Sequence, residues 1–151
     1  MVQLKRILLV EDNQYDVELI LAVLAENNLS NEVMIVRDGA EALNYLYLRG
    51  PSEQPPESYP AVVLLDLKLP KIDGLEVLER IKSDPALKSI PVVMLTSSRE
   101  ECDVVRSYGL GANAYVVKSV DFEEFAESLK QLGLFWCVTN QPPPRGLSGM
   151  T

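Results

Sequence analysis

Short runs of apolar and β-branched residues recur along the chain at similar intervals. Each run is three to five residues long and lacks the alternation with polar residues that marks a half-exposed strand. Continuous apolar runs of this kind are typical of strands buried on both faces of a sheet. The pattern therefore predicts five buried strands, at Ile7–Val10, Val33–Val36, Ala61–Leu65, Val92–Leu95 and Tyr115–Val117.

The segments between these runs have helical periodicity. The first carries apolar residues at Val17, Ile20, Leu21 and Leu24, and the third at Leu75, Leu78 and Ile81. Three pairs have the capping-box spacing that starts helices, namely Asp38 with Glu41, Ser98 with Glu101, and Asp121 with Glu124. Strands that alternate with helices favour a parallel sheet, because parallel neighbours need long crossover connections. We expect a doubly wound α/β domain.

Two stretches interrupt this alternation. Residues 50–60 (GPSEQPPESYP) hold four of the ten prolines and predict an exposed loop before the third strand. Residues 140–151 (NQPPPRGLSGMT) are typical of a polyproline-rich tail without a core of its own. We therefore expect one domain over residues 1–133, followed by a C-terminal extension over residues 134–151 that is not a separate domain.

The composition excludes several classes of function. A chain of 151 residues, 47% hydrophobic and 24% charged, is the size of one globular domain. Its formal net charge of -8 disfavours nucleic acid as a partner. It contains no histidine, which removes serine or cysteine catalysis of the histidine-assisted kind and histidine-ligated zinc.

Cysteine usage and hydropathy bear on the compartment. Cys102 and Cys137 lie far apart and suggest neither a disulfide framework nor a redox motif; Cys102 is expected to be a small buried hydrophobe. No apolar run approaches the length of a membrane span, and the N-terminus lacks a signal-peptide pattern. A cytoplasmic protein without membrane attachment is expected.

Chemistry-bearing residues gather at the predicted strand ends. Glu11 and Asp12 follow the first strand, Asp66 the third, Thr96 the fourth and Lys118 the fifth. Since ligands of open parallel sheets bind at the carboxyl ends of the strands, these side chains are expected to converge. Clustered carboxylates repel one another unless a cation joins them, and Mg²⁺ prefers such oxygen ligands. A carboxylate here could attack a phosphoryl group, with Lys118 and Thr96 contacting the phosphoryl oxygens.

Four motifs at these positions resemble the receiver domain of two-component response regulators: VEDN at 10–13, LLDLKLPKIDG at 64–74, MLTSS at 94–98 and AYVVKS at 114–119. The resemblance covers about residues 5–132. It implies a flavodoxin-like fold with strand order 2-1-3-4-5 and a phosphorylation-dependent signalling switch. A histidine kinase would donate the phosphoryl group, and signalling would proceed through protein contacts without a DNA-binding output domain.

The resemblance also implies a role for each site residue. Asp66 would be the phosphoacceptor, and Mg²⁺ would be bound by Asp12, Asp66, the backbone carbonyl of Lys68 and, through water, Glu11. Thr96 and Lys118 would contact the phosphoryl group, and Tyr115 would be the switch aromatic. The chain would not be an enzyme beyond slow self-dephosphorylation.

Three features narrow the resemblance to the receivers that partner bacterial phytochrome histidine kinases. These features are the loop at 50–60, the DPALKSIPVV segment at 84–93 and the ending LGLFWCVTNQPPP at 132–144. One residue departs from the family pattern, since Ser119 stands where the family usually has a proline after a cis peptide bond. A cis bond before a residue other than proline costs about 2.5–4 kcal/mol, so the isomer of Lys118–Ser119 stays open.

Other interpretations compete with these. Asp66 and Lys118 could form a structural ion pair in a scaffold receiver that is not phosphorylated, and Tyr115 could be a core residue. A small Mg²⁺-dependent phosphohydrolase of the haloacid-dehalogenase type would also use an aspartate nucleophile. Such enzymes usually carry a second aspartate where this chain has Lys68. The GxGxxA spelling from Gly109 to Ala114 follows a predicted helix, so it indicates a helix end and turn rather than a dinucleotide site.

Apolar residues continue past Gly133, which is expected to stop the last helix. They are Leu134, Phe135, Trp136 and Val138. Aromatic residues in an exposed segment are typical of interaction sites. We expect a homodimer formed by this arm together with the face of the fourth and fifth helices; the alternative is that the aromatic pair packs on its own domain.

Overall fold

The computed structural model describes residues 6–27, 33–48, 59–97, 100–118 and 121–139, apart from the side chains of residues 48, 122, 138 and 139. Their fold is a five-stranded parallel sheet in the order β2-β1-β3-β4-β5. The strands are β1 (Ile7–Val10), β2 (Val33–Val36), β3 (Val62–Leu65), β4 (Val92–Thr96) and β5 (Ala114–Val117). The predicted strands and their order are confirmed, with boundaries shifted by at most one residue.

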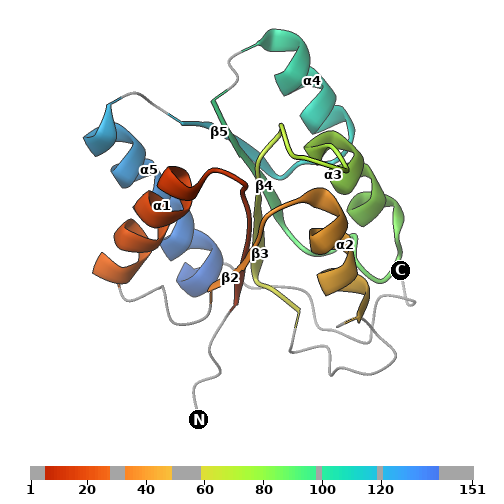
Figure 1. Cartoon of the computed structure of the whole chain (residues 1–151), viewed down its shortest axis with the longest axis horizontal. Coiled ribbons are helices and arrows are strands. Elements are labelled where there is room, and N and C mark those ends of the chain that lie inside the picture. Colours follow the sequence, from red (N-terminus) through yellow and green to blue (C-terminus); the bar gives the residue numbers. More distant parts are fainter. Residues whose placement is uncertain (1–5, 28–32, 49–58, 98–99, 119–120, 140–151) are drawn as a thin grey trace.

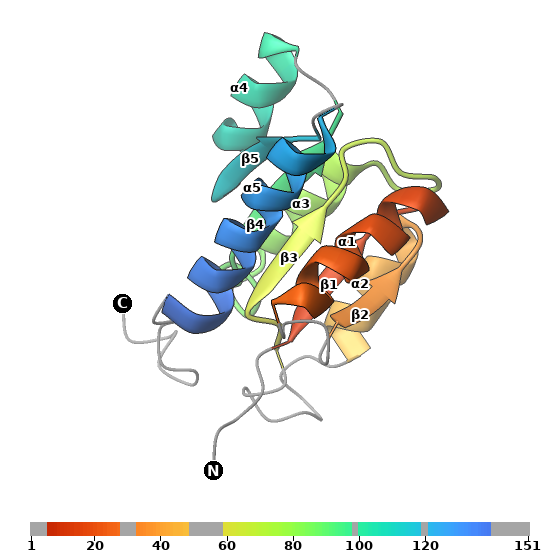
Figure 2. The same ribbon diagram turned by 90° about the vertical axis from the view of Figure 1, so that its left-hand side faces the viewer.

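Helices cover both faces of the sheet (Figure 1), as the doubly wound class requires. They are α1 (Gln14–Glu26), α2 (Gly39–Leu48), α3 (Gly74–Ser83), α4 (Glu101–Gly109) and α5 (Phe122–Leu134). Figure 2 shows α1 and α5 side by side on one face. The opposite face carries α2, α3 and α4 (Figure 1).

Two hydrophobic clusters lie on either side of the sheet. Leu8, Val10 and Leu65 contribute to the cluster under α2 and α3, while Leu9 and Leu64 contribute to the cluster under α1 and α5. Successive strand residues point to opposite faces, so both faces must be apolar when helices cover both. This geometry explains why β1, β3 and β4 are buried along their whole length.

The start of α2, the start of α5 and the end of α3 agree with the signals in the sequence. The side chain of Asp38 accepts a hydrogen bond from the backbone N–H of Glu41 at 2.8 Å, and Asp121 accepts one from Glu124 at 3.2 Å. Helix α3 ends at Ser83, before the Asp84-Pro85 pair. Gly111 has φ of 104°, a conformation that favours glycine, in the turn before β5.

Two expectations about local structure were wrong, and a third, the helix start at Ser98, concerns a residue outside the described ranges. Among the described residues, α4 begins at Glu101 with Glu100 at its N-cap. Cys102 is exposed, because it lies on the solvent side of α4. Gly133 does not stop α5, which runs to Leu134 and continues as a π-helical turn, η2 (Phe135–Thr139).

The continuation past Gly133 has a physical cause. A glycine inside a helix costs about 1 kcal/mol relative to alanine. Leu132, Trp136 and Cys137 are partly buried and pack against the cluster under α1 and α5, and burial of apolar surface of this size outweighs that cost. Residues 134–139 of the predicted extension are therefore helical, and Trp136 and Cys137 contact their own domain.

Hydropathy along the helices bears on membrane association. Among the residues that the structure describes, no helix combines the length and the apolar character needed to cross a bilayer.

Candidate functional site

Backbone hydrogen bonds place three candidate residues at the carboxyl edge of the sheet. Each residue directly follows a strand and continues the pairing with the neighbouring strand by one step. The N–H of Glu11 donates to the carbonyl of Val36 at 3.0 Å, that of Asp66 to Val10 at 3.1 Å, and that of Lys118 to Thr96 at 2.7 Å. The convergence expected at the strand ends is thus a consequence of the parallel ladder.

The ammonium group of Lys118 joins the cluster. Its Nζ lies 2.8 Å from Oδ2 of Asp16 and 3.4 Å from Oδ2 of Asp66, and it also donates to Oε1 of Glu11. A lysine ammonium has three protons, and these three carboxylates accept them. The side chain of Lys118 is only 11% exposed, so little water competes for these bonds.

Burial and the neighbouring charges raise the pKa values of two of these groups. Glu11 is 1% exposed, and burial raises its pKa to about 7, although the hydrogen bond and charge of Lys118 oppose the shift. Burial alone would lower the pKa of Lys118. The hydrogen bonds that Lys118 donates to Asp16 and Glu11, with the negative charge of Asp66, raise it above its ordinary value. Lys118 therefore stays charged.

Three carboxylates are arranged as ligands for a hard cation. One oxygen from each of Glu11, Asp12 and Asp66 lies within 4.8 Å of the others. Glu11 is buried, Asp66 is nearly so, and Asp12 faces solvent. The second oxygen of Glu11 accepts a hydrogen bond from the backbone N–H of Asn13 at 3.1 Å, which fixes this side chain. This oxygen-only donor set, open to solvent at Asp12, fits Mg²⁺.

The remaining predicted residues occupy different places. Thr96 is the last residue of β4 and is buried. Tyr115, on β5, is half-buried and packs against the cluster under α2 and α3, beside Met94. Lys68 is exposed in the loop after β3, and the role of its carbonyl stays a prediction. The bond between Lys118 and Ser119 lies outside the described residues.

The loop between β3 and α3 closes tightly behind Asp66. The N–H of Gly74 donates to the carbonyl of Leu67 at 2.9 Å. A Cβ at Gly74 would lie 2.2 Å from the carbonyl oxygen of Asp66. Glycine is therefore required here by close approach of the backbone, which holds Asp66 at the edge of the sheet.

The sequence interpretation missed Asp16. This residue is in the first turn of α1, where the cap of Asn13 accepts its backbone N–H at 3.2 Å. A signal was present: Asp16 is one helical turn after Asp12, in a helix that starts at the acidic edge. That signal is easily overlooked, because acidic residues are common in the first turn of a helix, where they interact favourably with the helix dipole.

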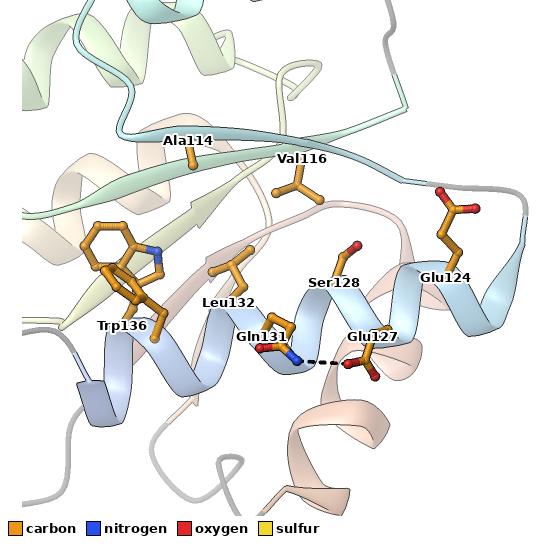
Figure 3. Close-up of a pocket in the computed structure, with 9 residues that line it drawn as sticks. Ala114, Val116, Glu124, Glu127, Ser128, Gln131, Leu132 and Trp136 are labelled. Carbon is orange, nitrogen blue, oxygen red and sulfur yellow. Dashed lines mark hydrogen bonds between the residues drawn. The ribbon is translucent and has the colours of Figure 1, made fainter.

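A second feature is an open groove between β5 and α5. Its apolar lining is Ala114, Val116, Leu132, Phe135 and Trp136, and its polar lining is Glu124, Glu127, Ser128 and Gln131. Figure 3 shows Trp136 below β5, and the side chain of Gln131 donating to Glu127 at 2.9 Å. The rings of Phe135 and Trp136 meet edge to face, with centroids 4.9 Å apart.

Comparison with known proteins identifies relatives over nearly the whole chain. The response regulator receiver domain matches residues 7–130. Response regulator Rcp1 of Synechocystis sp. (strain ATCC 27184 / PCC 6803 / Kazusa) is 44% identical over 135 residues, which are 89% of this chain and 90% of Rcp1. A structure of the Mn²⁺-bound form of Rcp1 has a TM-score of 0.81 at 40% identity and covers 93% of this chain and 99% of that one.

Two further solved structures are similar. The phosphorylated cyanobacterial phytochrome response regulator RcpA has a TM-score of 0.83 at 45% identity, covering 94% of this chain and 100% of RcpA. The bacteriophytochrome response regulator RtBRR has a TM-score of 0.71 at 57% identity, covering 98% of this chain and 89% of RtBRR. With the strand order and the family match, these relationships establish that the chain belongs to the response regulator receiver family.

Proposed function

We propose that this protein is a signalling switch in which Asp66 accepts a phosphoryl group from a histidine kinase in a Mg²⁺-dependent reaction. One observation carries the proposal: Asp66 belongs to a carboxylate cluster that is open to solvent at Asp12, and it also contacts the buried, charged Lys118. This arrangement supplies a nucleophile, ligands for a metal and a cation for the incoming phosphoryl charge.

Mg²⁺ would be held by Asp12 and Asp66, with Glu11 acting through water and the carbonyl of Lys68 as a further ligand. The Mn²⁺-bound form of the relative Rcp1 supports a divalent cation here. When bound, the ion neutralises the negative charge of the transferring phosphoryl group.

In the transfer step, a carboxylate oxygen of Asp66 attacks the phosphorus of a phosphohistidine. The new P–O bond forms as the P–N bond breaks, and the electron pair of that bond returns to the imidazole nitrogen of the kinase. Lys118 stabilises the phosphoryl oxygens from the buried side, and the hydroxyl of Thr96, next to Asp66 in the sheet order, donates to one of them.

The kinase partner is proposed to be of the phytochrome type. The relatives RcpA and RtBRR are described as phytochrome and bacteriophytochrome response regulators, which supports this choice. We propose that the phosphoryl transfer takes place in the cytoplasm. The phosphorylated protein would signal through protein contacts rather than by binding nucleic acid. The net charge of -8 supports a protein partner over nucleic acid.

We further propose a homodimer that uses the face of α4 and α5, including the groove between β5 and α5, and the segment from Leu134 to Val138. Phe135 is 46% exposed beside this apolar groove, a feature typical of protein interfaces. Trp136 packs on its own domain and shapes the groove. The side chain of Val138 lies outside the described residues.

The function is tested by incubating the purified protein with Mg²⁺ and acetyl phosphate, then measuring intact mass and acetyl phosphate consumption together. A single phosphoryl adduct with slow consumption supports the switch. Rapid multiple turnover without a lasting adduct would indicate a phosphohydrolase, although the exposed Lys68 stands where that class usually has its acid. No adduct and no consumption would indicate a scaffold.

A further inference from the structure

Asp16 has no role in the chemistry proposed above, yet its carboxylate makes a short contact with the ammonium group of Lys118. Its Oδ2 lies 2.8 Å from Nζ of Lys118, whereas Oδ2 of Asp66 lies 3.4 Å away. The two residues are 102 positions apart and come from the first turn of α1 and the end of β5. The lysine is thus held toward α1 as well as toward the proposed phosphoacceptor.

We propose that Asp16 is a releasable counter-ion that holds Lys118 while Asp66 carries no phosphoryl group and competes with that group for the lysine. This inference rests on the proposed function. Asp16 is a positioning residue, since it acts through Lys118 rather than on the reacting atoms.

The hydrogen-bond inventory of Lys118 supports competition. Glu11, Asp16 and Asp66 accept the three protons of the ammonium group. A new acceptor must therefore displace an existing one. A phosphoryl group brings about -1.5 to -2 charges on three acceptor oxygens, which attracts the lysine more strongly than a single carboxylate does.

The burial of each carboxylate indicates which one Lys118 releases most easily. The side chain of Glu11 is 2% exposed, so losing its ammonium partner would leave a buried oxygen with little access to water. The side chain of Asp16 is 29% exposed, so water can solvate its carboxylate after Lys118 leaves. The acceptor oxygen of Asp66 is itself changed by phosphorylation. Asp16 is therefore the partner that the lysine can leave at least cost.

The test uses Asp16→Asn, which keeps the shape and removes the charge, and Asp16→Ala as a second variant. Glu18→Gln is the matched control, because Glu18 is exposed on the same helix and bonds to Gln14 instead. Trifluoroberyllate, a phosphoryl analogue, is titrated at saturating Mg²⁺. Both Asp16 variants should bind it about three- to tenfold more tightly than wild type, and Glu18→Gln should not differ.

A second readout monitors the lysine directly. Without Mg²⁺ or the analogue, the side-chain ammonium NMR signal of Lys118, assigned by its loss in Lys118→Arg, should move in Asp16→Asn and stay in Glu18→Gln. If the signal does not move, or if the Asp16 variants bind the analogue no more tightly than wild type, the inference about Asp16 is wrong and the proposed function still stands. If the wild type binds no trifluoroberyllate, the proposed function fails with it.

Discussion

The carboxyl group of Glu11 is buried beside those of Asp12 and Asp66. Ionising it in the folded state therefore costs free energy. Burial raises its pKa to about 7 from an ordinary value of 4.5, so between these two pH values the folded state holds a proton that the unfolded state releases. The resulting stability is complete below about pH 4.5 and is lost as the pH rises through 7.

Without Mg²⁺, the free energy of unfolding should therefore fall by roughly 2 kcal/mol between pH 5 and pH 7. Urea denaturation across this range measures the loss. Glu11→Gln, which has no proton to release, should show a flatter profile. A wild-type profile parallel to that of the variant would contradict the assigned burial effect.

Asp12 differs from Glu11 because it faces solvent, where an incoming hydrated cation meets the cluster first. Asp12→Ala should weaken Mg²⁺ binding by about tenfold or more and slow phosphorylation in parallel, because Mg²⁺ binds through few carboxylates. Calorimetric titration with Mg²⁺ provides the measurement, with Glu26→Ala, exposed at the far end of α1, as the control. Unchanged affinity in Asp12→Ala would move the metal site elsewhere.

The loop from β3 to α3 shows how one element holds the site. Gly74→Ala would place a Cβ 2.2 Å from the carbonyl oxygen of Asp66, so the backbone must shift. The variant should lose about 1–3 kcal/mol of stability and should accept phosphoryl groups more slowly. Thermal unfolding and the rate of adduct formation measure the two effects.

Gly109 supplies the matched control on another helix. It is the last residue of α4, and a Cβ there would meet nothing within 4 Å. Gly109→Ala should leave stability unchanged or raise it slightly, because alanine favours the helix. Equal losses in the two variants would show that close approach to Asp66 is not what requires glycine at position 74.

The same elements show which features could be predicted from sequence. Strands buried on both faces leave continuous apolar runs, so β1 and β3 were predicted nearly to the residue, and with them the strand ends that carry Glu11 and Asp66. Helix ends were harder to predict. The end of α5 depends on how Trp136 packs against the core, which outweighs the local preference of Gly133.

The contact between Asp16 and Lys118 was not predicted for a related reason. It joins two segments that meet only because β1 and β5 end at the same edge while α1 folds back over the sheet. Local patterns predict which residues reach that edge. Which acceptor a long lysine side chain chooses there depends on tertiary packing.

For the whole molecule, the proposed dimer has a direct test in the exposed ring of Phe135. Phe135→Asp should raise the dimer dissociation constant by about tenfold or more, because a charge in an apolar interface is costly. Tyr47→Asp is the control, since Tyr47 is 45% exposed, close to the 46% of Phe135, and belongs to α2, which covers the face of the sheet opposite α5. Light scattering across a dilution series measures both. A monomeric wild type, or equal effects of the two variants, would contradict the proposed interface.

The central claim is that Asp66 receives the phosphoryl group, and transfer from a phosphorylated phytochrome-type histidine kinase to Asp66→Asn tests it most directly. Asparagine keeps the shape of aspartate but is a poor nucleophile and metal ligand. With Mg²⁺, wild type should gain one phosphoryl group by intact mass, while the Asp66→Asn protein should gain none and retain wild-type thermal unfolding. A phosphoryl adduct of equal yield on the folded Asp66→Asn variant would contradict the account.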